Sequence, residues 1–171
     1  FTDPNDPRHD VALIINGEKI YVSKQILAFH SPVFNAMFFG DFAEKNKKEI
    51  ELNDVVREEF IELLHVIYPS NKKITDDSAE FLLKLGDQFQ IGYVMDRVEK
   101  YIFNSLTWRY MDHDLLRMAD KYNLFALQQH CLSQLKTKRG CECLKHSCSY
   151  NEYSDETKAA IRELEATLPD E

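Results

Sequence analysis

The sequence is poor in glycine, and most of its length lacks cysteine, two residues on which many catalytic and disulfide-stabilised proteins depend. Its first hundred residues contain no cysteine, and the four that occur are Cys131, Cys141, Cys143 and Cys148. A disulfide scaffold would spread its cysteines along the chain, so we expect a reducing compartment, either the cytoplasm or the nucleus. Five glycines leave no phosphate-binding glycine loop and no nucleophile elbow, and no H-E-x-x-H motif is present. The sequence therefore indicates no enzyme and no cofactor.

Long apolar runs and excess positive charge are also missing. The longest aliphatic run is Val11–Ile15, far short of the ~20 residues that a membrane-spanning helix needs. The formal net charge is −8, and an acidic surface repels phosphate backbones. We expect no membrane and no nucleic-acid partner. The chain begins at Phe1 rather than Met, so we also expect a piece of a longer protein.

Short strands open the chain after a leader. Residues 1–9 hold two prolines among polar residues, which is typical of an extended linker. The run Val11–Ile15 and the alternating Glu18–Val22 flank Asn16-Gly17, two residues that tolerate positive φ. The pattern predicts a β-hairpin whose first strand is buried on both faces.

Two short helices follow, at 24–29 and 32–38, and meet at Ser31-Pro32. Serine accepts hydrogen bonds at an N-cap, and proline in the first helical position loses none. The spacing further predicts a strand at 49–52, a helix capped by Asn53 and Asp54, and a short strand at 73–74. The paired helices carry more apolar surface than one hairpin can hide: Ile26, Leu27, Val33, Phe34, Met37 and Phe38.

Beyond Thr75 the pattern is helical and contains an internal repeat of 33 residues. The segment 83–91 aligns with 116–124, and each copy reads as a helix, a tight turn after an aromatic, and a second helix. Asp87 and Asp120 occupy equivalent places, which favours a capping or turn role over paired-carboxylate catalysis. A last helix is expected at 155–168, capped by Ser154.

Three of the cysteines cluster near the C-terminus. Cys141, Cys143, His146 and Cys148 place four soft ligands within eight residues, a set that zinc accepts. The usual knuckle spacing is C-x-x-C, and one C-x-C pair cannot easily wrap a tetrahedron. We therefore interpret 141–148 as a loop at the end of a helix, with no metal, and keep zinc as the alternative.

An aromatic-rich segment, Phe38–Glu44, lies where helix gives way to a charged loop. Phe38 and Phe39 are interpreted as core or dimer residues. Phe42 is harder to bury because Asp41, Glu44 and Lys45 surround it in the sequence. An exposed aromatic beside a carboxylate is the usual composition of a hot spot for a protein partner.

The order of elements resembles the BTB (POZ) fold, an α+β class with a small mixed sheet and a cluster of helices. The resemblance covers about residues 10–103 and is closest to the MATH–BTB group, whose substrate-binding MATH domain would precede Phe1. It divides the chain into a linker (1–9), a BTB domain (10–103) and a helical extension (104–171), with a helical pair at 109–136. The residues that carry it are Asp10-Val11, Ile20–Lys24, Leu27–Phe38, Tyr68, Leu82-Leu83 and Leu85–Phe89.

The resemblance implies a homodimer that serves as a substrate adaptor of a cullin-3 ubiquitin ligase. In such adaptors a hydrophobic-x-Glu motif follows the paired helices, and Phe42-Ala43-Glu44 falls on it. Phe42 is then expected to insert into the N-terminal domain of cullin-3 while Glu44 fixes the loop, and Tyr68 and Asp76 match the same surface. The paired helices would form the dimer interface, and the substrate would bind a domain outside this chain. His30 departs from the arginine that often precedes Ser-Pro.

One alternative stays open within the family. A BTB domain can serve only for self-association or for holding a co-repressor in a transcriptional regulator, with no ligase role. The motif at 42–44 and the helical pair at 109–136 favour the adaptor over this alternative.

Overall fold

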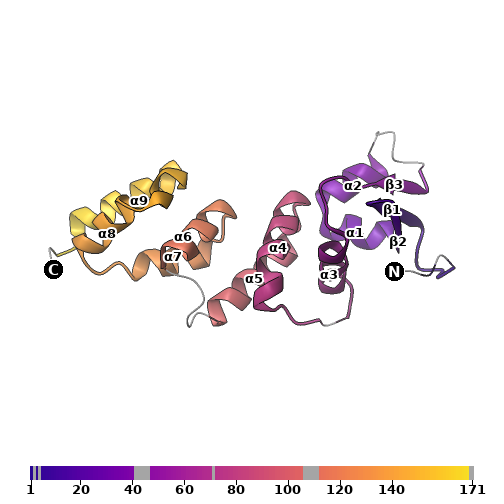
Figure 1. The fold of residues 1–171 in the computed structure, drawn as a ribbon, viewed down its shortest axis with the longest axis horizontal. Helices are drawn as coiled ribbons and strands as arrows, with labels where there is room; N and C mark the ends of the chain where they lie inside the picture. The colour runs from indigo at the N-terminus through magenta and orange to yellow at the C-terminus, as the bar shows by residue number, and fades with distance from the viewer. Residues whose placement is uncertain (2, 4, 41–46, 71, 106–111, 170–171) are drawn as a thin grey trace. The chain divides into compact units, whose positions relative to one another are not determined.

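The computed structural model describes residues 1, 3, 5–40, 47–70, 72–105 and 112–169 (Figure 1). The chain divides into two compact units, Phe1–Val98 and Glu99–Glu171, and each is described by itself. Within the described residues, no helix combines the length and apolar character that crossing a bilayer requires.

Unit 1 begins with the hairpin that the sequence predicts. Strands β1 (Val11–Ile15) and β2 (Glu18–Val22) pair antiparallel, and Asn16 and Gly17 between them have φ of 52° and 82°. Two consecutive positive φ values suit a two-residue hairpin turn, because its twist then matches that of the strands. The short strand β3 (Glu49–Glu51) pairs parallel with β1, so the described sheet has the order β2-β1-β3.

The leader lies against unit 1 rather than extending from it. The carbonyl of Phe1 accepts a hydrogen bond from the Tyr21 backbone N–H at 2.8 Å, on the outer edge of β2. Its ring lies 4.9 Å from the Tyr68 ring and 5.5 Å from that of His65, both edge-on. Residues near the N-terminus therefore cover part of the last turn of the third helix.

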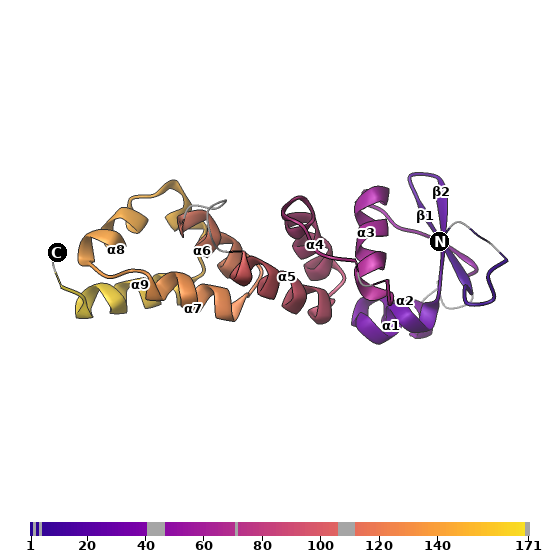
Figure 2. The same cartoon turned by 90° about the horizontal axis from the view of Figure 1, so that it is seen from below.

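Helices α1 (Lys24–His30) and α2 (Pro32–Phe39) meet at a corner formed by Ser31 (Figure 2). The Ser31 side chain is fully buried; its Oγ accepts from the Phe34 N–H at 3.1 Å and donates to the Phe89 carbonyl at 2.5 Å. The Phe34 ring stacks on that of Phe89 with centroids 4.7 Å apart. These contacts of Ser31 and Phe34 hold the paired helices against Phe89, at the end of the first helix of the repeat.

Three longer helices complete the described part of unit 1: α3 (Arg57–Ile67), α4 (Asp76–Gln88) and α5 (Gly92–Asn104). The last turns of α5 belong to unit 2. The predicted cap of α3 at Asn53 and Asp54 is wrong. Asp54 has φ of 60°, a left-handed conformation that ends the preceding strand segment, and Val56 becomes the N-cap. The predicted strand at 73–74 is also wrong: Ile74 buries its side chain, but Lys73 and Ile74 belong to no strand.

The 33-residue repeat is confirmed in the backbone of its two turns. Gln90 and Asn123 lie 33 residues apart and have φ of 52° and 53°. In each copy the next residue donates to a carbonyl five positions earlier, Ile91 to Gly86 at 2.7 Å and Leu124 to Ala119 at 2.8 Å. This is the Schellman pattern that ends helices. The sequence repeat therefore encodes the same helix–turn–helix twice.

Unit 2 contains the end of α5 and the helices α6 (Asp112–Lys121), α7 (Phe125–Ser133), α8 (Lys138–Lys145) and α9 (Asp155–Thr167), with a 3-10 turn at Cys148–Glu152. Helices α6 and α7 pack as one pair, and α8 and α9 as another (Figure 1). Ser154 caps α9, as predicted. The interpretation of 141–148 as a loop is wrong, because Thr137 caps a helix that runs through Cys141 and Cys143.

Candidate protein-interaction surface

The structure separates the six apolar residues of the paired helices into two groups. Leu27, Phe34 and Phe38 have at most 1% of their surface exposed and pack inside unit 1, so they offer little surface to a second protomer. Their assignment to a dimer interface stays a prediction. Ile26, Val33 and Met37 are half-buried and retain surface for a partner.

Phe29 is the residue that sequence reasoning missed. Its side chain is 84% exposed on α1, three positions after Ile26, so the two share one face of the helix. The sequence does contain a signal for this exposure: Phe29 lies two positions after Leu27, and therefore on the opposite side of the helix from that buried residue. Fully burying one phenylalanine side chain contributes roughly 1.5–3 kcal/mol, so Phe29 makes this face a candidate for contact with a partner.

A series of aromatic contacts connects Phe29 to the first turns of α5. The His30 ring lies 5.1 Å from that of Phe29 and 5.3 Å from that of Tyr93, and the Arg97 guanidinium lies 5.7 Å from the centre of the Tyr93 ring. Burial lowers the pKa of His30 below its usual value, which favours the neutral imidazole in this contact.

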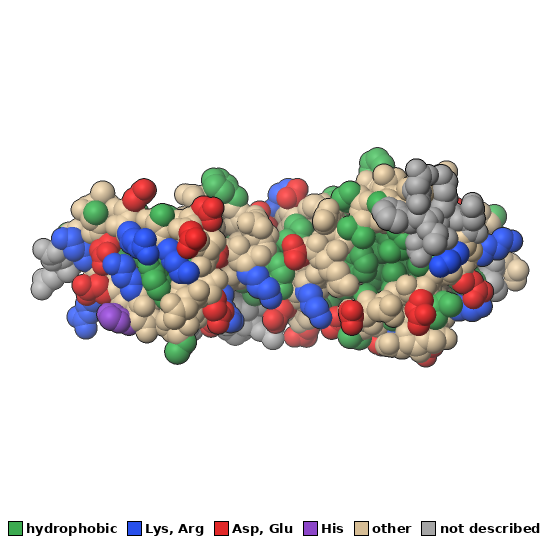
Figure 3. Space-filling view, turned by 90° about the horizontal axis from the view of Figure 1, so that it is seen from above, with side chains coloured by type: hydrophobic (Ala, Val, Ile, Leu, Met, Phe, Trp, Pro, Cys, Tyr) green, Lys and Arg blue, Asp and Glu red, His purple; other side chains and the backbone are tan. Residues whose placement is uncertain are grey.

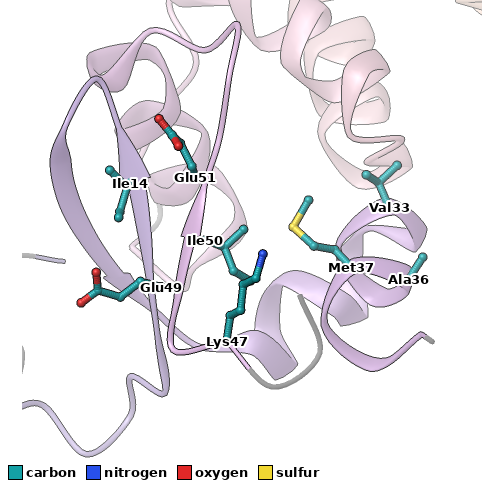
Figure 4. A pocket seen from close by; sticks show the side chains of 8 residues that line it. All are labelled: Ile14, Val33, Ala36, Met37, Lys47, Glu49, Ile50 and Glu51. Carbon is teal, nitrogen blue, oxygen red and sulfur yellow. The ribbon is translucent and has the colours of Figure 1, made fainter. Parts of the chain in front are cut away.

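Beside α2 lies a pocket of about 820 Å³ (Figure 4). Apolar side chains line it from the helix and the strands, and three charged residues complete the lining: Val33, Ala36, Met37, Ile14 and Ile50, with Lys47, Glu49 and Glu51. In the close-up the Met37 side chain points from α2 toward Ile50. Figure 3 shows hydrophobic side chains gathered on the face of unit 1 that carries α2 and β3. An exposed group of apolar side chains with charged residues at its edge is a candidate interaction site.

The sequence segment after α2 contains the predicted hot spot. Phe42 and Glu44 lie outside the described residues. The last residue of α2, Phe39, is 50% exposed and stands three positions before Phe42. The described part of α2 therefore ends with an exposed aromatic residue shortly before the motif in the sequence.

Tyr68 and Asp76 occupy different local settings. The Tyr68 hydroxyl accepts a hydrogen bond from the Ser23 N–H at 2.8 Å, and its ring is covered by Phe1. Burial raises the pKa of Tyr68 above its usual value. Asp76 is exposed in the first turn of α4, where the helix dipole favours a carboxylate. The Tyr68 hydroxyl is thus held by the backbone of Ser23, whereas the Asp76 side chain is exposed at the surface.

The candidate zinc ligands do not converge. Cys141 is fully buried in unit 2, while Cys143, His146 and Cys148 are exposed on α8 and the following turn. Among the residues that the structure describes, no group of three or more His, Cys, Asp or Glu side chains comes together as a metal site. The geometry therefore does not support zinc at these four residues.

The hairpin, the helices paired at Ser31-Pro32 and the added strand β3 occur in the order expected of one family. The sequence model of the BTB/POZ domain matches residues 3–106. The chain belongs to the BTB/POZ family. The matched segment contains the whole described surface on α1 and α2, so this surface is part of a BTB/POZ domain.

Relatives extend the likeness beyond the matched segment. The chain is 45% identical to BTB and MATH domain-containing protein 38 of Caenorhabditis elegans over 159 residues, which is 90% of this chain and 39% of that protein. It is 37% identical to BTB and MATH domain-containing protein 36 of the same organism, over 94% of this chain and 50% of that protein. The chain thus spans half or less of these relatives, and BTB/POZ together with the helices after it forms one shared segment.

Two other matches have lower sequence identity to the chain. The chain is 32% identical to kelch repeat and BTB domain-containing protein 1 of ectromelia virus, over 67% of this chain and 20% of that protein. The structure of the BTB domain of human gigaxonin is 21% identical and superposes with a TM-score of 0.49, over 56% of this chain and 79% of that one.

Proposed function

We propose that this BTB/POZ protein is a homodimeric substrate adaptor of a cullin-3 ubiquitin ligase, and that it has no catalytic activity of its own. The observation that carries the proposal is the exposed apolar surface of α1 and α2, which leads directly into the loop that contains Phe42-Ala43-Glu44. The relatives that combine BTB with MATH support an interaction module that joins one protein to another.

Dimerisation is supported by the side chains that unit 1 leaves unburied. Ile26 and Phe29 on α1, and Val33 and Met37 on α2, expose apolar atoms beside the same corner. A twofold axis lets one apolar patch contact its own copy, so that each of these residues is used twice. Phe29 is the strongest candidate for the centre of such an interface because it is the most exposed.

Sedimentation velocity tests the dimer with a matched pair of variants. Phe29→Ser should shift the protein from dimer to monomer at micromolar concentration, because it removes the largest exposed apolar group of the surface. The control is Val56→Ser, which removes a 47% exposed apolar side chain from another element, at the N-cap of α3. A wild-type monomer, or a Phe29→Ser dimer as tight as the control, would contradict the proposed interface.

The cullin contact is supported by the position of the loop in the chain. Phe39 ends α2 half-exposed, and the hydrophobic-x-Glu motif begins three residues later. Asp76, also exposed, begins α4 and adds a carboxylate to the same domain. We assign Phe42 as the apolar anchor for cullin-3 and Glu44 as the residue that fixes the loop.

Size-exclusion chromatography with light scattering tests the assembly as a whole. Mixed with the N-terminal domain of cullin-3, the wild-type protein should elute at the mass of two chains and two cullin fragments. Phe29→Ser should give one chain with one fragment, since the dimer and cullin contacts are separate. A folded wild-type dimer that elutes without cullin would leave self-association, or the holding of a co-repressor, as the function.

A further inference from the structure

Phe1, in the leader of the chain, covers part of the surface that the family resemblance assigns to cullin-3. Tyr68, the C-cap of α3, is one of the assigned residues, and the Phe1 ring stands edge-on to the Tyr68 ring with centroids 4.9 Å apart. The Phe1 ring is also edge-on to that of His65, three positions earlier on the same face of α3, at 5.5 Å. One leader side chain, itself half-buried, therefore occupies the last turn of α3.

The backbone of Phe1 is attached to unit 1 as well. Its carbonyl accepts a hydrogen bond from the Tyr21 N–H at 2.8 Å. Tyr21 belongs to β2, which lies at the edge of the described sheet, where outward-pointing backbone groups are available to an extended segment. The ring contacts and the backbone hydrogen bond belong to the same residue, so they form and break together.

Other hydrogen bonds of the leader connect its residues with one another. The Asp6 carboxylate accepts from the Arg8 backbone N–H at 3.0 Å and pairs with the Arg8 guanidinium, and the Asp6 carbonyl accepts from the His9 N–H at 3.0 Å. The His9 ring stacks on that of Phe1 with centroids 6.2 Å apart. The leader thus turns back on itself and presents Phe1 to α3 and β2. A segment attached mainly through one residue can detach while the domain stays folded.

We propose that the leader is an inhibitory strap: Phe1 covers part of the surface on which cullin-3 binds, and cullin-3 must displace it to reach Tyr68 and His65. This inference rests on the proposed function, because it takes the Tyr68 surface to be the cullin surface. The Tyr68 ring stays in place when Phe1 leaves, since its hydroxyl accepts a hydrogen bond from the Ser23 N–H at 2.8 Å. The surface under the strap is therefore formed before cullin-3 arrives.

The size of the inhibition follows from the fraction of molecules in which the strap is detached. A protein that binds its partner in one of two states has its affinity reduced by the fraction in the competent state. Two edge-to-face ring contacts and one backbone hydrogen bond hold Phe1, and each of these is individually weak in water. We expect them to keep the strap attached in about 80–90% of molecules, which lowers the affinity for cullin-3 by about five- to tenfold.

Calorimetric titration of the full chain with the N-terminal domain of cullin-3 tests the competition. Phe1→Ala should bind about five- to tenfold more tightly than the wild type, whereas Phe1→Tyr, which keeps a ring, should bind like the wild type. The control is Arg8→Ala, because the exposed Arg8 side chain pairs with Asp6 inside the leader. If the wild type binds and Phe1→Ala binds no more tightly than the control, the strap is refuted and the adaptor stands. If neither the wild type nor Phe1→Ala binds, both are refuted.

Hydrogen exchange of the Tyr21 amide, followed by NMR, separates displacement from a purely structural role of Phe1. The Phe1 carbonyl protects this N–H, so saturation with cullin-3 should speed its exchange by about five- to tenfold, and Phe1→Ala alone should do the same. Partner binding ordinarily slows exchange, which makes the expected sign distinctive. Ile20, paired with Leu13 inside the hairpin, is the reference amide and should not speed up. A Tyr21 amide that exchanges no faster in the cullin complex would show that Phe1 stays attached, and the proposal fails.

Discussion

The carboxylate of Asp120, at the end of α6, caps the start of α9 through Ser154. Asp120 accepts hydrogen bonds from the Ser154 backbone N–H at 2.7 Å and from its hydroxyl at 2.6 Å. The buried Thr157 hydroxyl donates to the same carboxylate at 2.5 Å. One side chain of the repeat thus connects the α6–α7 pair to the last helix, 34 residues further along the chain.

Removing this carboxylate should destabilise unit 2. Asp120→Ala leaves the Thr157 hydroxyl and the Ser154 N–H without their acceptor, and hydrogen bonds to charged groups contribute roughly 1.5–3 kcal/mol each, though not additively. We expect a loss of about 3 kcal/mol in the free energy of unfolding, measured by urea denaturation. The control is Asp87→Ala, at the equivalent place of the first repeat, where the side chain is exposed. Equal losses for the two variants would show that Asp120 has no special role.

Ser31→Ala should destabilise unit 1. The change removes the N-cap acceptor for the Phe34 N–H and the donor to the Phe89 carbonyl, both in the core. We expect a loss of about 2 kcal/mol in the free energy of unfolding. Ser23→Ala is the matched control, because Ser23 precedes α1 but its side chain makes no capping hydrogen bond. A loss for Ser31→Ala no larger than that of the control would contradict the role of the corner.

Tyr153 should make stability fall at alkaline pH. Burial raises its pKa to about 12, above the ordinary value of 10.0, so the folded state keeps the proton that the unfolded chain releases first. This contribution to stability is fully present below pH 10 and is lost as the pH rises toward 12, by up to about 2 kcal/mol. Urea denaturation of the wild type and of Tyr153→Phe at pH 9 and pH 11.5 measures it. A wild-type loss equal to that of the phenylalanine variant would show that the Tyr153 hydroxyl does not titrate in this way.

Local signals predicted those parts of the fold that short stretches of chain determine. The pair Asn16-Gly17 requires positive φ and specifies the hairpin, and Ser31-Pro32 specifies the corner because both residues suit a helix start. The repeat was visible because its two turns use the same hydrogen bonds around Gln90 and Asn123. In each case the determining residues lie within a few positions of the structure they produce.

Features that depend on tertiary packing were not predictable in the same way. The periodicity of the paired helices identified Leu27 and Phe34 as apolar but could not tell a buried face from an interface. The residue type of Asp54 predicts a helix cap, whereas its positive φ places it in the turn before α3. The helix through Cys141 was missed because its stability comes from packing against α9, and its short polar sequence gives a weak signal.

The most direct test of the adaptor is a calorimetric titration with the N-terminal domain of cullin-3. The wild-type protein should bind with sub-micromolar affinity, and the double variant Phe42→Ala, Glu44→Ala should lose at least about 30-fold, as expected for a hot spot. Asp41→Ala, Lys45→Ala is the control, since it changes the flanking charges and keeps the motif. Undiminished binding by the double variant would refute the assignment of the loop. No binding by a folded wild-type dimer would contradict the adaptor itself.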